Sequence, residues 1–358
     1  MALPLQITVE DLAAGRVDRL LGDYDPEARE IVTLVSVDHP VSTETLHRAA
    51  VRAMSTDRIL IGVARRMLPM SSDVDILLEE FATTFAVNGG GNDSVVFTDE
   101  VDARAIGLAE AVARNPHSST IFLDTLRATA SLDVPDALQV ESLAYSALLG
   151  GGEFREWLAG REAPSSPPMV ADPVLARRKG DTLHITLNRP QRRNAYGAQL
   201  RNELVRALTI AEADESIELV IVDGAGTSFC AGGDLAEFGL AANHSEAHLI
   251  RTRGGAGRLV DALRDRIRFE IHGPCVGAGV EIPALAGRLV ADPHTTFLLP
   301  EVSMGLIPGA GGTVSLPRRI GRWRSFALCV TAQHIDAEQA LSWGLVDEVR
   351  PREAAIEL

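Results

Sequence analysis

A proline-rich stretch divides the chain into two parts with different sequence patterns. Residues 161–173 read REAPSSPPMVADP, which contains four prolines, two serines and little apolar content. Proline fixes one backbone dihedral and removes a hydrogen-bond donor, so this composition favours an extended linker over a helix or strand. We therefore predict a linker at residues 162–172 with separately folded sequence on each side of it.

The part before the linker is predicted to be mainly helical. Apolar residues recur at helical spacing in four segments, at 103–114, 119–129, 137–149 and 153–158. Nearer the N-terminus, Ile31–Val37 and Ile59–Val63 read as short strands on either side of a helix at 43–54. We treat residues 1–98 as an α+β segment or a degenerate copy of the domain that follows the linker, and residues 99–161 as a helical segment.

After the linker, strand and helix patterns alternate. Val174–Arg178 and Leu183–Leu187 flank a Lys-Gly-Asp turn and predict a hairpin. Further strands are predicted at 219–223, 267–271, 289–291 and 296–299, and helices at 198–213 and, as one long amphipathic helix, at 247–266. This alternation predicts an α/β domain with a largely parallel sheet over residues 173–358.

Composition excludes several classes of function. The formal net charge of −15 argues against a nucleic-acid partner, which needs a basic face. Three cysteines without a CxxC pair, and no third ligand near His244 and His248, argue against a metal site. The sequence has no run of 18 apolar residues and no secretory signal pattern, so we expect a cytoplasmic protein that does not enter a membrane.

Two loops of small residues follow predicted strands and precede predicted helices. They are Gly224–Leu235, GAGTSFCAGGDL, and His272–Glu281, HGPCVGAGVE. Glycine and alanine let a ligand approach the backbone, and a helix start leaves N–H groups unpaired. Two such loops facing each other would offer two donors to one oxygen, as in an oxyanion hole. The alternatives are a phosphate cradle or plain tight turns, although neither loop has a dinucleotide or Walker pattern.

Two glutamates lie beside these turns. Glu281 ends the second loop, and Glu301 follows a predicted strand and precedes another glycine-rich turn, GLIPGAGGT. Carboxylates in such apolar, small-residue surroundings can serve as a general acid and a general base. Glu281 and Glu301 are therefore the candidate acid/base pair.

Five motifs occur after the linker in a fixed order. They are NRP at 188–190 with RNA at 193–195, FCAGGDL at 229–235, GPCVGAGVE at 273–281, PE at 300–301 with GLIPGAGGT at 305–313, and AEQAL at 337–341 with GLVD at 344–347. Through these motifs the segment from about Val174 to Val349 resembles the crotonase superfamily, the enoyl-CoA hydratase/isomerase family. The resemblance covers about half of the chain.

The resemblance implies a spiral core of β-β-α units that binds an acyl-CoA thioester, with coenzyme A supplied as part of the substrate and no other cofactor. The amides of Ala231 and Ala278 would bind the thioester oxygen, and the amide of Gly309 would help to hold the catalytic water. The CoA-binding residues would be Arg193, Ala195, Gly232, Gly233, Asp234 and Gly277. The resemblance also implies a homo-oligomer, a trimer or a hexamer.

Because both glutamate positions of the family's hydratases are filled, the expected reaction is syn hydration of a trans-2-enoyl-CoA. Glu281 would activate water and Glu301 would protonate C2. An isomerase, a hydrolase or a cofactor-free oxygenase on the same scaffold remains an alternative, as does a non-catalytic CoA-binding subunit. Six arginines at 251, 253, 258, 264, 266 and 268 are expected on a solvated helix face, and contact of one or two of them with CoA phosphates is the less favoured alternative.

The helical segment before the linker resembles the tail that closes the acyl pocket in this family. Asp99–Arg161 begins with DEV, which Val346–Leu358 echoes, and ends in EFREWLAGR. We expect that the tail precedes the core in this chain, as in a permuted or truncated tandem arrangement, and that it covers the acyl pocket from there.

Overall fold

Tertiary contacts divide the computed structural model into two compact units, which are described separately. Unit 1 comprises residues 1–124 and 320–331, and unit 2 comprises residues 125–319 and 332–358. The structure describes residues 4–18, 31–68, 71–87, 93–163, 165–241 and 243–352. The end of the sequence echo, residues 353–358, lies outside them. Residues 125–161 belong to the same unit as the sequence that follows the linker.

Unit 1 contains a five-stranded sheet in which every pairing is parallel, with the strands in chain order. The two strands and the helix predicted near residues 31–63 are confirmed as β2, β3 and α2. The strands are β1 Leu5–Thr8, β2 Val32–Ser36, β3 Ile59–Ala64, β4 Thr83–Ala86 and β5 Val95–Phe97, and the helices are α1 Val9–Ala13, α2 Thr43–Ser55, α3 Ser72–Glu79, α4 Val101–Arg114 and α5 Pro116–Ala128, which continues into unit 2. The part before the linker thus has a sheet that is more extensive than the sequence indicated.

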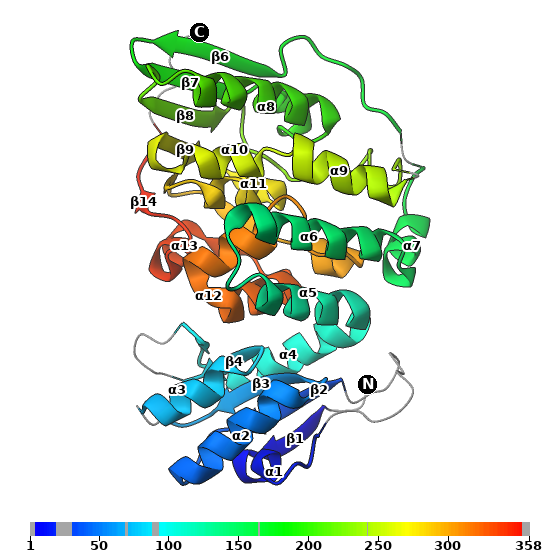
Figure 1. The fold of residues 1–358 in the computed structure, drawn as a ribbon, viewed down its shortest axis with the longest axis vertical. Coiled ribbons are helices and arrows are strands. Elements are labelled where there is room, and N and C mark those ends of the chain that lie inside the picture. The colour runs from blue at the N-terminus through cyan, green and yellow to red at the C-terminus, as the bar shows by residue number, and fades with distance from the viewer. Residues whose placement is uncertain are drawn as a thin grey trace. The chain divides into compact units, whose positions relative to one another are not determined.

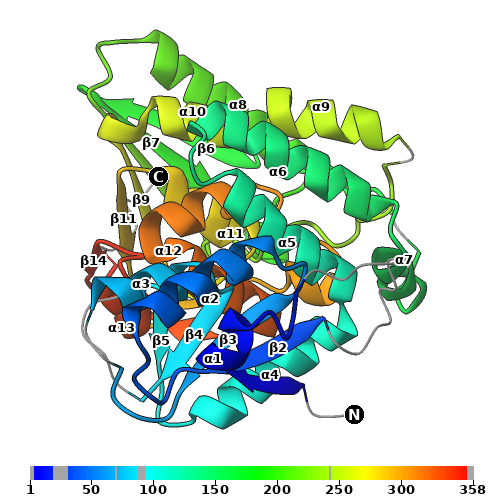
Figure 2. The ribbon, with the colours of Figure 1, turned by 60° about the horizontal axis from the view of Figure 1, so that its bottom comes forward.

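Apolar packing and helix caps explain why unit 1 folds this way. All six residues of β3 are buried, as expected for a parallel strand covered on both faces. Helices α1, α2 and α3 pack in a row, and α4 packs against β2, β3 and β4 (Figure 2). Ser42 and Ser71 cap α2 and α3 by accepting hydrogen bonds from backbone amides in the first turn of each helix.

Unit 2 is built on a six-stranded sheet in the order β14-β11-β9-β8-β7-β6. The predicted hairpin is confirmed as the antiparallel pair β6–β7, and all other pairings in this sheet are parallel. A second sheet has the order β10-β12-β13. The strands are β6 Val174–Lys179, β7 Thr182–Leu187, β8 Leu219–Gly224, β9 Ile267–Ile271, β10 Pro274–Val276, β11 Arg288–Ala291, β12 Thr296–Leu298, β13 Ile335–Asp336 and β14 Glu348–Val349.

The helices of unit 2 place two chain segments, one before and one after the linker, next to each other. Helix α6 packs against both α9 and α10, so residues before the linker contact the α/β core (Figure 1). The helices are α6 Val134–Leu149, α7 Gly152–Ala159, α8 Ala198–Ala213, α9 His244–Gly254, α10 Gly257–Ala262, α11 Ala278–Glu281, α12 Gly312–Thr331, which continues into unit 1, and α13 Ala337–Trp343.

The prediction of one continuous helix over residues 247–266 is wrong. Helix α9 ends at Gly254, Gly255 is extended with φ −82° and ψ 151°, and α10 begins at Gly257. Three glycines within four residues weaken the helix, because glycine loses the most backbone entropy on becoming helical. No helix among the described residues is both long and apolar enough to cross a membrane.

Candidate active site

The two glycine-rich loops lie side by side, as their positions after β8 and β9 predict. The amide of Phe229 donates to the carbonyl of His272 at 2.9 Å, and the amide of Val276 donates to the carbonyl of Cys230 at 3.1 Å. These bonds place the first loop against β10. Small residues are required here, since a Cβ on Gly279 would stand 2.2 Å from the carbonyl oxygen of Cys230. The loops therefore face each other in the way that an oxyanion hole needs.

The structure changes one member of the predicted amide pair. The amide of Ala231 donates to the carbonyl of Arg193 at 2.9 Å, and Ala231 does not line the cavity described below. An amide already bonded in this way has no hydrogen left for a ligand. Gly233, two residues later, does line the cavity, and its amide has no acceptor among the described residues. Gly233 therefore replaces Ala231 as the candidate donor from the first loop.

The second predicted amide, that of Ala278, remains a candidate. Ala278 is the first residue of α11 and lines the same cavity. The first amides of a helix have no acceptor within the helix, and the part of the chain that the structure describes provides none for Ala278. Gly277, just before it, has φ +47°, a conformation that favours glycine. This turn exposes the Ala278 amide at the cavity.

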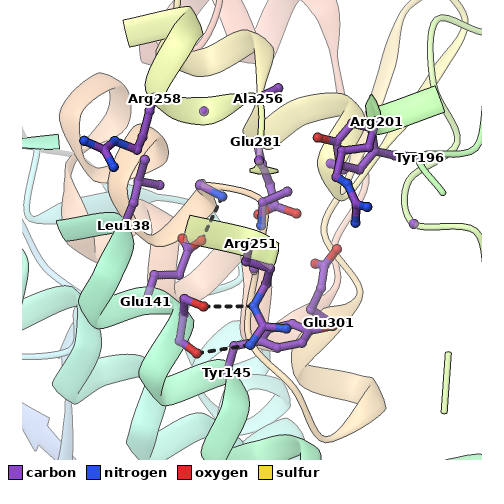
Figure 3. A pocket seen from close by; sticks show the side chains of 18 of the residues that line it. Leu138, Glu141, Tyr145, Tyr196, Arg201, Arg251, Ala256, Arg258, Glu281 and Glu301 are labelled. Carbon is purple, nitrogen blue, oxygen red and sulfur yellow. Dashed lines mark hydrogen bonds between the residues drawn. The ribbon is translucent and has the colours of Figure 1, made fainter. Parts of the chain in front are cut away.

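A cavity of about 210 Å³ lies between the loops and α6. Figure 3 shows Glu281 and Glu301 at this cavity, together with side chains from α6 and α9. Glu281 and Glu301 both lie next to Gly277, because a Cβ built on Gly277 would stand 2.2 Å from Glu301 Oε1 and 3.7 Å from Glu281 Oε1. The two carboxylates predicted to act together are thus brought to one place.

Glu281 and Glu301 differ in their hydrogen bonds. Oε2 of Glu281 accepts from the amides of Ala310 and Gly312, at 2.7 and 2.9 Å. Oε2 of Glu301 is buried and has no partner among the described residues. Burial raises the pKa of Glu281 above its usual range. The pKa of Glu301 is raised well above its usual value, first by burial and then by the charge of Glu281. These surroundings favour the protonated form of Glu301, whereas the two amide donors favour the ionised form of Glu281.

A third buried carboxylate, Glu141 on α6, was not predicted. Its Oε1 accepts from the amide of Gly311 at 2.8 Å, and its Oε2 accepts from the amide and hydroxyl of Thr313, each at 2.9 Å. Burial, together with the charge of Glu281, raises its pKa. The signal available in the sequence was a lone acidic residue within an apolar helical stretch, ALQVESLAYSALL.

These three carboxylates predict a pH dependence of stability. A raised pKa means that the folded protein holds a proton that the unfolded chain releases above its ordinary pKa. The free energy of unfolding should therefore decrease as pH rises from about 5 to about 8. Urea denaturation at pH 6 and pH 8 should show a smaller decrease for Glu301→Gln, which cannot ionise, than for the wild type. An equal decrease in both proteins would contradict the raised pKa of Glu301.

Arginine 251 lies within the fold rather than on a solvated face. Its Nε donates to Ser142 Oγ at 3.0 Å and its Nη2 donates to the Ser142 carbonyl at 3.2 Å. The guanidinium carbon lies 4.5 Å from the centre of the Tyr145 ring. That ring packs on the backbone of Gly309, where a Cβ would stand 2.3 Å from Tyr145 Cδ2. Gly309 lines the cavity, as its predicted role requires.

The remaining predicted CoA-binding residues do not line this cavity. Apart from Gly233, they are Arg193, Ala195, Gly232, Asp234 and Gly277. The carboxylate of Asp234 is buried and accepts from Arg192 at 2.6 and 3.1 Å, so it holds the loop that contains Arg193. CoA binding by these residues stays a prediction. Among the described residues, no three His, Cys, Asp or Glu side chains are grouped so that they could hold a metal ion.

Comparisons with known proteins match the part of the chain that carries the loops and both predicted glutamates. The family model described as enoyl-CoA hydratase/isomerase matches residues 177–357. The chain belongs to this family. It is 34% identical to the 2,3-dehydroadipyl-CoA hydratase of Escherichia coli (strain K12), over 51% of this chain and 71% of that protein. It is 30% identical to the mevalonyl-coenzyme A hydratase SIDH of Beauveria bassiana, over 53% of this chain and 71% of that protein.

Solved structures from the family also match this chain. An enoyl-CoA hydratase from Bacillus anthracis is 32% identical, with a TM-score of 0.46, over 50% of this chain and 70% of that one. The predicted crotonase-superfamily membership is confirmed by the family match. Helix α6, which contributes Glu141 and Tyr145, lies outside the matched residues. The chain is an enzyme of the enoyl-CoA hydratase/isomerase family. Its cavity is also lined by Glu141 and Tyr145, which the family model does not match.

Proposed function

We propose that the chain is a hydratase that adds water across the double bond of a trans-2-enoyl-CoA. The observation that carries the proposal is that Glu281 and Glu301 meet at one cavity beside two unpaired amides, those of Gly233 and Ala278. An isomerase needs one group to move a proton, whereas hydration needs both a base for water and an acid for C2. Two carboxylates with different surroundings match the second requirement.

The two amides would polarise the thioester carbonyl. Negative charge develops on this oxygen when water attacks C3, and preorganised N–H donors stabilise that charge more than they stabilise the neutral substrate. Gly233 and Ala278 stand on loops that are hydrogen-bonded to each other, so the donors are fixed before the substrate binds. The enolate formed in this way is the intermediate that then takes a proton at C2.

The carboxylates would divide the proton transfers. Glu281 accepts two backbone hydrogen bonds, which favour its ionised form, so it takes a proton from the attacking water. Glu301 has no such donors at its buried oxygen and so keeps its proton, which it gives to C2. One O–H bond of water, the O–H bond of Glu301 and the π bond between C2 and C3 break, while a C–O bond at C3, a C–H bond at C2 and an O–H bond on Glu281 form. The proton on Glu281 restores Glu301 after the product leaves.

The proposal is tested by incubating the protein with crotonyl-CoA and following loss of the enoyl absorbance, with the product identified by mass. We expect a product heavier than the substrate by one water. Release of free CoA would identify a hydrolase, and a shifted double bond with no change in mass would identify an isomerase. Binding of CoA thioesters with no conversion would instead support a non-catalytic subunit.

We also propose that α6 closes the acyl pocket. Its packing against α9 and α10, and the bonds from Glu141 to the start of α12, support this assignment. A homo-oligomer remains part of the proposal, and light scattering of the purified chain measures it directly.

A further inference from the structure

Three arginines, at positions 201, 251 and 258, line the cavity, and Arg251 is held in place before any ligand binds. Arg251 on α9 reaches across to α6, where it donates to Ser142 and Ser146 and stacks on Tyr145 (Figure 3). Its Nε and Nη2 are used in these bonds. Because Nε, Nη2 and one face of the guanidinium are already held, the side chain loses little entropy when a ligand binds to Nη1.

The remaining edge of this guanidinium is unpaired. Arg251 Nη1 has no acceptor among the described residues, and Arg251 forms no ion pair with any described carboxylate. Glu141 is the carboxylate whose charge it experiences most, yet both Glu141 oxygens already accept from Gly311 and Thr313. Placing an unpaired cation in a partly dry site has a free-energy cost, which a ligand anion would offset.

The position of Arg251 indicates which part of a substrate it would meet. Tyr145, on which it stacks, packs on Gly309, and both Tyr145 and Arg251 line the same cavity as Glu281 and Glu301 (Figure 3). The cation therefore lies beside the carboxylates that are proposed to react. The phosphates of CoA are separated from the thioester by the whole pantetheine arm, so the group that Arg251 meets belongs to the acyl chain.

We propose that Arg251 binds a carboxylate on the acyl chain, so that the preferred substrates are CoA monothioesters of unsaturated dicarboxylic acids. This rests on the proposed hydratase function, which it deepens. The planar fork of a guanidinium matches a carboxylate better than it matches a hydroxyl or a methyl group. Ser142 and Ser146 keep the fork oriented, while the Tyr145 ring closes one face of it.

The competing explanation is that Arg251 only balances the charge of the three glutamates. In that case its loss would slow every substrate alike, because it would act through Glu141, Glu281 or Glu301. Binding of an acyl carboxylate instead predicts an effect on one class of substrate. The selectivity between two substrates of equal length separates the two explanations.

The experiment uses pairs of trans-2-enoyl-CoA thioesters with four to eight acyl carbons, identical except for a terminal carboxylate or a terminal methyl group. The kcat/KM of each is measured for the wild type, Arg251→Met and Arg251→Lys. The matched control is Arg253→Met, an exposed arginine on the same helix that does not line the cavity. Calorimetric binding of saturated dicarboxylic and monocarboxylic acyl-CoAs provides a readout that does not depend on turnover.

We expect the wild type to prefer the carboxylate member at one chain length. Arg251→Met should reduce this preference on the order of 10²-fold, as expected when one partner of a desolvated charge pair is removed. Arg251→Lys should keep part of the preference, and Arg253→Met should keep all of it. Calorimetry should show the same loss of discrimination in Arg251→Met.

Other outcomes distinguish failure of the proposed role of Arg251 from failure of the proposed hydratase function. Equal or faster turnover of the methyl series by the wild type would overturn the role of Arg251 while leaving the hydratase function intact. An equal slowing of both series in Arg251→Met would also overturn it, in favour of charge balance. Failure of the wild type to hydrate any member of either series would contradict the hydratase function itself.

Discussion

Replacement of Glu301 or Glu281 by glutamine should slow hydration of an enoyl-CoA by about 10²–10⁴-fold, with little change in the affinity for the thioester. Glutamine keeps the shape of each side chain but can neither give nor take the required proton. Because Glu301 is assigned as the acid at C2, Glu301→Gln should also abolish exchange of the C2 proton with solvent. Steady-state kinetics, together with deuterium exchange at C2 of the product, measures both effects.

The matched control for this prediction is Glu338→Gln. Glu338 is exposed on α13 and does not line the cavity, so this substitution should leave kcat/KM unchanged. The double variant Glu281→Gln/Glu301→Gln should be about as slow as the slower single variant, because residues that act as a unit in one reaction have non-additive effects. Full activity in either single variant would refute the acid/base assignment.

Removal of the Ala278 amide should lower kcat by about 10²–10³-fold, the effect expected for losing one oxyanion donor. Ala278→Pro deletes the N–H at the first position of a helix, where the fixed φ of proline is tolerated. Ala278→Gly is the matched control, since it alters the side chain but keeps the donor. The prediction is checked by kcat for both variants and by their affinity for a saturated acyl-CoA, which should change much less than kcat.

The difference in kcat between Ala278→Pro and Ala278→Gly decides this test. If Ala278→Pro remains folded, as judged by its thermal transition, yet hydrates as fast as Ala278→Gly, then the amide does not stabilise the enolate. A loss of activity in both variants would point to the packing around α11 instead of the N–H group.

Local sequence patterns predicted the elements that form between neighbours in the chain. The hairpin β6–β7 followed from two β-patterned runs around a Lys-Gly-Asp turn, and the two loops followed from small residues between a strand and a helix. The convergence of Glu281 and Glu301 also followed, because each glutamate stands beside a turn at the end of a strand. These features form between segments that are close in the sequence, so local residue patterns are enough to predict them.

The features that were missed depend on long-range contacts. The amide of Ala231 is used by the carbonyl of Arg193, a contact between loops that periodicity does not reveal. Glu141 and Arg251 are drawn into the cavity because α6 packs on α9, although their sequence positions are more than 100 residues apart. The sequence predicted one helix across the break between α9 and α10, because the apolar residues keep their helical spacing there. The glycines nevertheless interrupt the helical backbone.

The central claim is that Glu301 and Glu281 perform opposite proton transfers during addition of water. It is tested most directly by turnover of crotonyl-CoA in D₂O, with the product analysed by mass and by NMR. The account predicts 3-hydroxybutyryl-CoA carrying one deuterium at C2, formed by the wild type and Glu338→Gln but not by Glu301→Gln. Recovery of an acyl group without added water, or equal deuterium incorporation by Glu301→Gln, would contradict it.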